Sequence, residues 1–148
     1  MNLRSKFSIL LILANLLLLL SCQQQSDKAK VIQVIDGDTI IIQGGYHVRY
    51  IGIDAPEKDE FSYLGAKQLN QELVEGKKIR LEKDVSDKDK YGRLLYYIFV
   101  DETFVNAELV RLGYAYARAY PPDTKYRVFL EAMEKEARQK QRGIWRSG

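Results

Sequence analysis

The chain has 148 residues, 46% hydrophobic and 29% charged with three prolines, which is typical of one globular domain and not of a disordered or collagen-like chain. A single Cys and a single His exclude a disulfide framework, multi-cysteine metal clusters and two-histidine zinc sites. The sequence has no nucleophile-elbow serine, no Walker loop and no dinucleotide-binding glycine motif, so carboxylates and arginines remain as the groups for chemistry.

The first segment has the pattern of an export signal. Arg4 and Lys6 precede an apolar run from Phe7 to Leu20, too short for a bilayer span of about 20 apolar residues but suited to a signal core of about 7 to 15. The run ends beside a small residue and Cys22, and this end resembles the bacterial lipobox, in which the Cys is lipidated and becomes the new first residue. A plain secretory signal with an unmodified Cys is the alternative. Removal of residues 1–21, which hold two of the 23 basic residues and none of the 20 acidic ones, leaves a net charge of only +1.

Residues 22–30 are predicted to form the lipidated Cys and a flexible tether, and residues 31–148 one folded domain. Alternating and β-branched apolar residues predict five strands, at Val31–Ile35, Thr39–Ile42, His47–Ile53, 78–82 and Leu94–Val100. Helical spacing of apolar residues predicts three helices, near Phe61–Leu73, Phe104–Leu112 and Asp123–Gln141. This order predicts an α+β protein, mainly a small antiparallel β-barrel with helices on one side.

Acidic residues gather at the ends of the first predicted strands. Asp36 and Asp38 lie on a turn between two strands, and Asp54 and Glu57 follow the next one. Carboxylates placed in this way suit a hard cation such as Ca²⁺, although Asp-Gly-Asp alone also fits a solvated hairpin turn. Arg49 precedes Asp54 on the same strand.

A charged loop supplies a second arginine, Arg93, directly after Gly92. A cation, two arginines and a spare carboxylate together suit phosphodiester hydrolysis, because they offset the charge that builds up on phosphorus and position the attacking water.

The chain resembles the thermonuclease, or staphylococcal-nuclease-like, family from Val31 to Trp145. The segments that carry the resemblance are Val34–Thr39, Val48–Glu57, Asp89–Arg93, Val105–Ala107 and Leu109–Gly113. The resemblance implies an oligonucleotide/oligosaccharide-binding (OB) fold, a five-stranded barrel with three α-helices.

The resemblance also implies roles for individual residues. Asp38 and Asp54 would bind Ca²⁺ directly, the backbone carbonyl of Ala55 and, through water, Glu57 would complete the site, and Asp36 would lie behind it. Glu57 would be the general base, while Arg49 and Arg93 would hold the phosphate. The family's best-known member has Thr where Ala55 stands, a change that keeps the carbonyl ligand.

Three further side chains are candidates for substrate binding. Lys90 is expected to contact phosphate or simply to be solvated, and Tyr91 to contact phosphate or to pack the loop. Tyr120 is the preferred base-stacking residue of a group of tyrosines that does not align cleanly with the family's, and packing at the barrel rim is the alternative. Trp145 is predicted to fasten the C-terminus to the core, and His47 to be a surface residue.

These expectations combine into a monomeric, Ca²⁺-dependent nuclease that is lipid-anchored to the bacterial cell envelope. By resemblance it would hydrolyse DNA and RNA, preferably single-stranded, and leave 3′-phosphate products. The alternative is a non-catalytic OB-fold module that binds single strands or protein. A binding module has no need of four acids beside a phosphate site, because they would repel the ligand.

Overall fold

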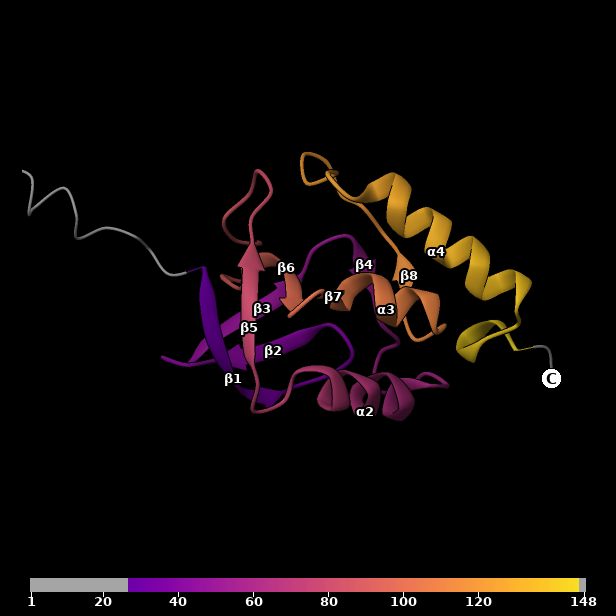
Figure 1. Ribbon diagram of the computed structural model, residues 1–148, viewed down its shortest axis with the longest axis horizontal. Helices are drawn as coiled ribbons and strands as arrows, with labels where there is room; N and C mark the ends of the chain where they lie inside the picture. The colour runs from indigo at the N-terminus through magenta and orange to yellow at the C-terminus, as the bar shows by residue number, and fades with distance from the viewer. Residues whose placement is uncertain (1–26, 147–148) are drawn as a thin grey trace, which may run out of the picture.

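The computed structural model describes residues 27–146 (Figure 1). The strands of the main sheet are β1 (Lys28–Val34), β2 (Thr39–Ile42), β3 (Tyr46–Tyr50), β5 (Lys78–Glu82), β6 (Leu94–Val100) and the short β7 (Thr103–Phe104). The helices are α2 (Tyr63–Val74), α3 (Val105–Arg111) and α4 (Arg127–Gln139), with a 3-10 turn η1 (Gly143–Trp145) after them. The predicted signal and Cys22 lie outside the described residues.

Five of these strands close into a barrel. The sheet order is β3-β2-β1-β5-β6, with antiparallel neighbours, and β6 then pairs in parallel with β3. A register shift between Val31 and Gln33 bends β1, so that its first half pairs with β5 and its second half with β2. The closed five-stranded barrel with three helices confirms the predicted OB-fold and its α+β class.

The folded region begins earlier than predicted. Lys28, Ala29 and Lys30 pair with Arg80, Ile79 and Lys78 on β5, and they therefore belong to the barrel and not to a tether. The prediction that the tether extends to residue 30 is thus wrong at its C-terminal end, because Lys28 and Lys30 face outward and only the small Ala29 packs against the core.

The third predicted strand is interrupted. β3 ends at Tyr50, and Gly52 has a φ of 79° that a residue with a side chain rarely adopts. After this kink, β4 (Ile53–Asp54) leaves the barrel and pairs with β8 (Tyr116–Ala117). A Cβ atom on Gly52 would lie 2.7 Å from Leu130 on α4, so the close packing of α4 also requires glycine here.

The buried face of α2 differs from the predicted apolar stripe. Leu69 and Leu73 pack against the core as expected, but Phe61 is 88% exposed and Leu64 is exposed as well. The fully buried line of the helix is Ala66, Asn70 and Val74. A buried Asn on this line is not a pattern that apolar periodicity detects, so the prediction identified the helix and part of its inner face but missed Asn70.

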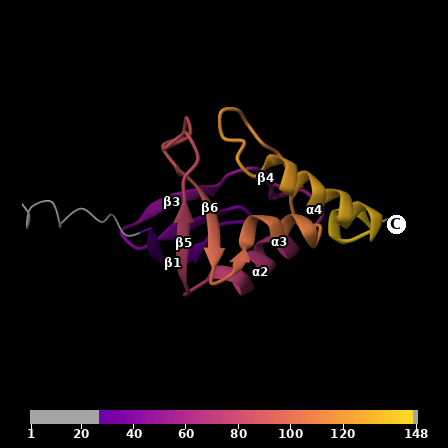
Figure 2. The same ribbon diagram turned by 45° about the horizontal axis from the view of Figure 1, so that its top comes forward.

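The helices cover the barrel on two sides (Figure 1), so the predicted placement of all helices on one side is wrong. Figure 1 shows α2 below the strands and α4 on the side away from β1, and Figure 2 shows α3 between α4 and the barrel. Trp145 packs edge-on against Tyr116 at 5.3 Å, under the guanidinium of Arg138 at 3.7 Å, so it fastens the C-terminal segment as predicted. Within residues 27–146, no helix has the length and apolar character needed to cross a bilayer.

The last helix is shorter than predicted. It begins at Arg127 and not at Asp123, because Asp123 pairs with Tyr120 in an isolated β-bridge. The segment before α4 is therefore a loop, and it forms one wall of the site described next.

Candidate active site

The turn between β1 and β2 carries the first two carboxylates. Asp36 accepts a hydrogen bond from the Asp38 amide at 3.0 Å through its Oδ1, which closes a local Asx turn. Gly37 packs closely against Ala55, just after β4, and against Ala66 on α2, because a Cβ atom there would be 2.6 Å from Ala55 and 2.9 Å from Ala66. The turn is thus fixed in place by its own side chain and by a close approach that only glycine permits.

Asp38 is a carboxylate held inside the protein. It is 6% exposed, and its Oδ2 accepts a hydrogen bond from the Ala55 amide at 2.7 Å while its Oδ1 accepts one from the Thr39 hydroxyl at 3.0 Å. Burial raises the pKa of Asp38 to about 6, the Arg49 guanidinium opposes this shift and the charge of Asp36 adds to it. The negative charge of Asp38 is therefore incompletely compensated by the surrounding protein.

Arg49 joins two of the predicted carboxylates. Its Nη2 lies 3.2 Å from Asp38 Oδ2 and donates to Asp54 Oδ1 at 2.9 Å. Its Nη1 donates to the backbone carbonyls of Tyr50 and Ile53, each at 2.9 Å, across the kink that separates β3 from β4. Arg49 therefore links the end of β3 to β4. It also holds Asp54, whose side chain is 43% exposed, toward Asp38.

The charged loop after β5 presents the second arginine. Arg93 donates through Nε to Asp89 Oδ2 at 2.7 Å, while Asp89 Oδ1 accepts the amides of Tyr91 and Arg93. Partial burial alone would raise the pKa of Asp89, but these hydrogen bonds outweigh it and hold the pKa below the ordinary value. Asp89 accepts a hydrogen bond only from Nε of the Arg93 side chain. The two terminal nitrogens of Arg93 have no hydrogen bond to the described residues.

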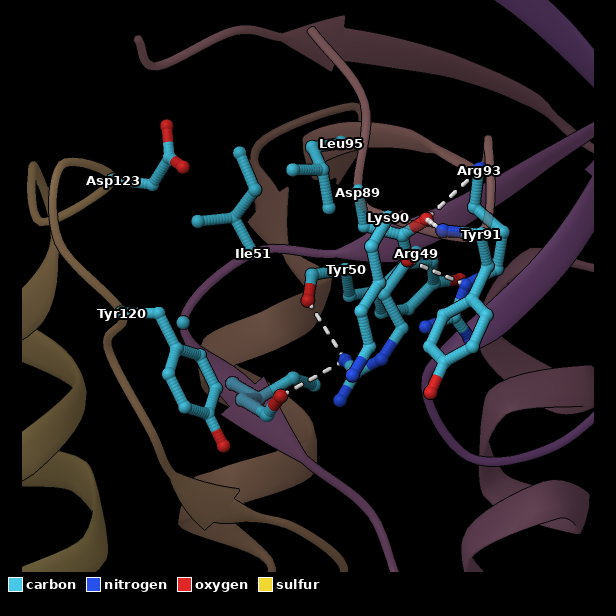
Figure 3. Close-up of a pocket in the computed structure, with 12 residues that line it drawn as sticks. Arg49, Tyr50, Ile51, Asp89, Lys90, Tyr91, Arg93, Leu95, Tyr120 and Asp123 are labelled. Carbon is cyan, nitrogen blue, oxygen red and sulfur yellow. Dashed lines mark hydrogen bonds and ion pairs between the residues drawn. The ribbon is translucent and has the colours of Figure 1, made fainter. Parts of the chain in front are cut away.

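Both arginines face one pocket of about 590 Å³. Figure 3 shows the Arg49 guanidinium between Tyr91 on one side and Tyr120 on the other, with Arg93 above Tyr91. Tyr91 is 73% exposed and Tyr120 65% exposed, so neither ring packs in the core. The remaining lining is partly apolar and includes Ile51 and Leu95.

The structure brings together only part of the predicted set. Arg49, Lys90, Tyr91, Arg93 and Tyr120 line the pocket. Asp38 and Asp54 are not part of the lining, but both contact Arg49, which is. By contrast, Glu57 is exposed beyond β4, where its amide donates to Glu60. The catalytic role of Glu57 thus stays a prediction.

Sequence reasoning missed two acids that build the pocket. Asp89 stands in a motif that carried the family resemblance, but no role was assigned to it. Asp123 is 7% exposed, and its Oδ1 accepts the amides of Val85 and Ser86 at 2.9 and 2.8 Å. No sequence signal marks Asp123, because its partners are backbone groups 37 and 38 residues away.

Asp123 and Asp84 form a reciprocal clamp between the two loops of the pocket. Asp123, on the loop of Tyr120, holds the amides of the 83–93 loop, and Asp84, on that loop, accepts the Lys125 amide at 2.9 Å. Asp84 also accepts the Tyr97 hydroxyl at 2.8 Å. The two walls of the pocket are therefore tied to each other by carboxylate hydrogen bonds, and the tie is anchored in the barrel.

The donor groups beside Arg49 suit a hard cation. Asp38 and Asp54 offer carboxylate oxygens that converge on one nitrogen, and the backbone of Ala55 lies against Asp38. Within residues 27–146 no three acidic, His or Cys side chains converge on a single point, so a cation here would draw its other ligands from the main chain and water. Ca²⁺ accepts such a mixed set of oxygen ligands.

The fold and the site together define a small OB-barrel hydrolase of the nuclease class. A family model described as "Staphylococcal nuclease homologue" matches residues 47–147. The chain is similar to a thermonuclease of Staphylococcus intermedius, at 40% identity over 76% of this chain and 73% of that protein. It is also similar to a thermonuclease of Staphylococcus hyicus, at 36% identity over 78% and 74%. The endonuclease YncB of Bacillus subtilis is 40% identical over 76% of this chain and 59% of its own. The chain belongs to the staphylococcal nuclease family.

Replacing Asp38 by Asn should stabilise the cation-free protein. A buried acid whose pKa is raised to about 6 binds a proton more readily when folded than when unfolded, so its ionisation destabilises the fold as the pH rises from about 4 to about 6. At pH 7 with chelator, Asp38→Asn should raise the free energy of unfolding by about 1–3 kcal/mol, since one pKa unit corresponds to about 1.4 kcal/mol. Urea unfolding at pH 5 and pH 7 measures this.

The exposed residue Asp59 provides the matched control, and Asp59→Asn should change little. A loss of stability in Asp38→Asn at pH 7 would show that the ion pair with Arg49 outweighs the cost of burial.

Replacing Asp123 by Ala should loosen the pocket without touching its arginines. The change removes the acceptor of two backbone amides, so the 83–93 loop loses two hydrogen bonds to the loop of Tyr120, while Asp84 still accepts the Lys125 amide. We expect KM for an oligonucleotide to rise about tenfold or more, equivalent to about 1.4 kcal/mol of binding, with a smaller change in kcat. Asp123→Asn keeps the oxygen acceptor and serves as the control; an equal rise in KM for both variants would contradict the clamp.

Proposed function

We propose that the protein is a Ca²⁺-dependent phosphodiesterase that hydrolyses DNA and RNA and leaves 3′-phosphate products. It would cut the nucleic-acid strand internally or at its ends. The observation that carries this proposal is the pair of arginines on one pocket: Arg49 is held by two carboxylates and two strand carbonyls, and Arg93 is held by Asp89. Each guanidinium is oriented before substrate arrives, which is what stabilisation of a phosphoryl transition state requires.

The two arginines would divide the work on the phosphate. The terminal nitrogens of Arg93 are open to the pocket and can donate to two phosphate oxygens, and the planar fork of an arginine suits this geometry. Arg49 would contribute positive charge beside the cation ligands. Ca²⁺ supplies charge neutralisation at the phosphate when it is bound at Asp38 and Asp54.

Glu57 would act as the general base. In this scheme Glu57 accepts a proton from the attacking water, the water oxygen bonds to phosphorus, and the bond to the 5′-oxygen breaks. Its exposed position beyond β4 supports access of water to the carboxylate. The 5′-hydroxyl then leaves with a proton from the medium.

Unpaired nucleic acid is the substrate form that the pocket favours. A volume of about 590 Å³ suits a nucleotide-sized ligand, and the apolar side chains of Ile51 and Leu95 offer a surface to a base. The exposed rings of Tyr91 and Tyr120 can stack on bases without regard to sequence, but only when the bases are not already stacked in a duplex.

We also propose that the protein is a monomer held at the cell envelope by a lipid on Cys22. The support is the sequence pattern of residues 1–22, and the anchor would then place the barrel close to the membrane, since only five residues separate Cys22 from Lys28.

The two catalytic assignments can be tested together. Glu57→Gln removes the base, and Arg93→Lys keeps a charge but loses the planar fork, so each should lower kcat by at least about 100-fold with little loss of nucleotide affinity. Single-turnover cleavage of single-stranded DNA and RNA with Ca²⁺, with Mg²⁺ and with chelator measures the effect. Arg127→Lys, on the exposed face of α4, is the matched control.

Near-normal kcat in both variants would remove these residues from the mechanism and favour the non-catalytic binding module. Activity that survives chelator would contradict the Ca²⁺ dependence.

The anchor has its own test. Cys22→Ser removes the thiol that would carry the lipid, so it should abolish incorporation of labelled palmitate and release the protein from membranes, to which an unlipidated chain has no acyl anchor. Membrane fractionation and palmitate labelling of the full chain in bacterial cells measure this. If the variant fractionates and labels like the unmodified chain, the anchor is not at Cys22.

A further inference from the structure

Two polar side chains are buried directly behind the turn that carries Asp36 and Asp38. Tyr50 on β3 is 1% exposed and Asn70 on α2 is 0% exposed. Polar groups at such depth must be hydrogen-bonded, because an unpaired donor or acceptor in the core is costly. Their partners therefore show what these two side chains are for.

The hydrogen bonds of Asn70 lead to the turn. Its Nδ2 donates to the backbone carbonyl of Asp36 at 2.9 Å, and its Oδ1 accepts the hydroxyl of Tyr50 at 2.9 Å. A carbonyl oxygen can only accept, so the amide of Asn70 has one allowed orientation, and the Tyr50 hydroxyl must donate. The pair thus forms a directed chain from Tyr50 through Asn70 to Asp36.

Tyr50 also holds the other end of the turn. Its backbone amide donates to the carbonyl of Asp38 at 2.9 Å. The carbonyls of Asp36 and Asp38 are therefore both fixed by groups that trace back to Tyr50, one directly and one through Asn70. Gly37 packs on Ala66, which lies one helical turn before Asn70 on the same face of α2. The turn is therefore held by hydrogen bonds at Asp36 and Asp38 and by close packing at Gly37.

An apolar pair at these two positions would fill the space without any hydrogen-bond requirement, but it would leave the Asp36 carbonyl without its partner. We propose that Asn70 is a positioning residue for the cation site, with Tyr50 as the group that orients it. Together they hold the Asp36–Asp38 turn so that the Asp38 carboxylate faces the Ala55 amide and Asp54. The inference deepens the proposed function and rests on it, because it assumes that Asp38 binds Ca²⁺.

The test compares Ca²⁺ affinity with stability in matched variants of the full chain. Asn70→Leu should lower Ca²⁺ affinity 10-fold to 100-fold, the range typical of losing an outer partner of a metal ligand. Tyr50→Phe leaves the bond from Asn70 to Asp36 in place and should cause a smaller loss. Val74→Ala, in the same buried line of α2, opens a cavity away from the turn and should lower stability while leaving Ca²⁺ affinity unchanged.

Calorimetric titration with Ca²⁺ at a temperature where each variant is folded gives the affinities. Hydrogen exchange of the Asp38 amide without Ca²⁺ gives a second readout, because that amide is bonded to Asp36 within the turn. We expect this exchange to be faster in Asn70→Leu than in Val74→Ala at equal global stability. Exchange equally slow in both would overturn the proposal.

Four other outcomes also decide it. Unchanged Ca²⁺ affinity in Asn70→Leu, or an equal loss in Val74→Ala, would make Asn70 a purely structural residue. If Asn70→Leu does not fold, unchanged affinity in Tyr50→Phe would overturn the proposal. If the unmodified protein does not bind Ca²⁺, the proposed cofactor is wrong, and the role of Asn70 fails with it.

Discussion

Arg49 is the interaction on which the geometry of the site depends. Its guanidinium contacts Asp38 and Asp54 and donates to two backbone carbonyls on either side of the kink at Gly52. These groups come from the turn before β2, from β3 and from β4, so this one side chain joins two acids that lie on separate segments of the chain. Because an arginine stays charged at any physiological pH, the positive charge at the centre of this arrangement does not change with pH. The rest of the site is arranged around a fixed positive charge.

The same design recurs on the opposite wall. Asp89 fixes Arg93 and the backbone around it, and Asp123 with Asp84 ties that loop to the loop of Tyr120. In each case a carboxylate accepts backbone amides from a segment with little apolar packing of its own. The loops that line the pocket can thus remain polar and accessible, while their positions are set by a small number of strong, charge-assisted hydrogen bonds.

The sequence predicts the barrel well, since its strands are rich in β-branched and other apolar residues and its helices have regular apolar spacing. It also predicts the arginines and acids, because they stand in short motifs at strand ends. It does not predict the roles of Asp123 and Asn70, whose partners are distant backbone groups. It also does not predict the interruption of the strand at Gly52. Lys28 and Lys30 have the composition of a polar linker, because lysines that face outward from the start of a strand cannot be told from a tether by sequence alone. Local periodicity records what faces the core and not which buried polar group completes another segment's hydrogen bonds.

The buried polar groups also explain how the site can have a fixed conformation and still lower the stability of the fold. Asp38 is ionised at neutral pH in surroundings that raise its pKa, so the cation-free fold bears an electrostatic penalty at this point. The penalty is confined to the turn, because the chain from Tyr50 through Asn70 satisfies the backbone there and the barrel core behind it is apolar. A cation bound at Asp38 and Asp54, as proposed above, would remove this penalty without requiring the turn to move. Under that proposal, charge would couple stability to occupancy of the site, while the core determines the conformation of the turn.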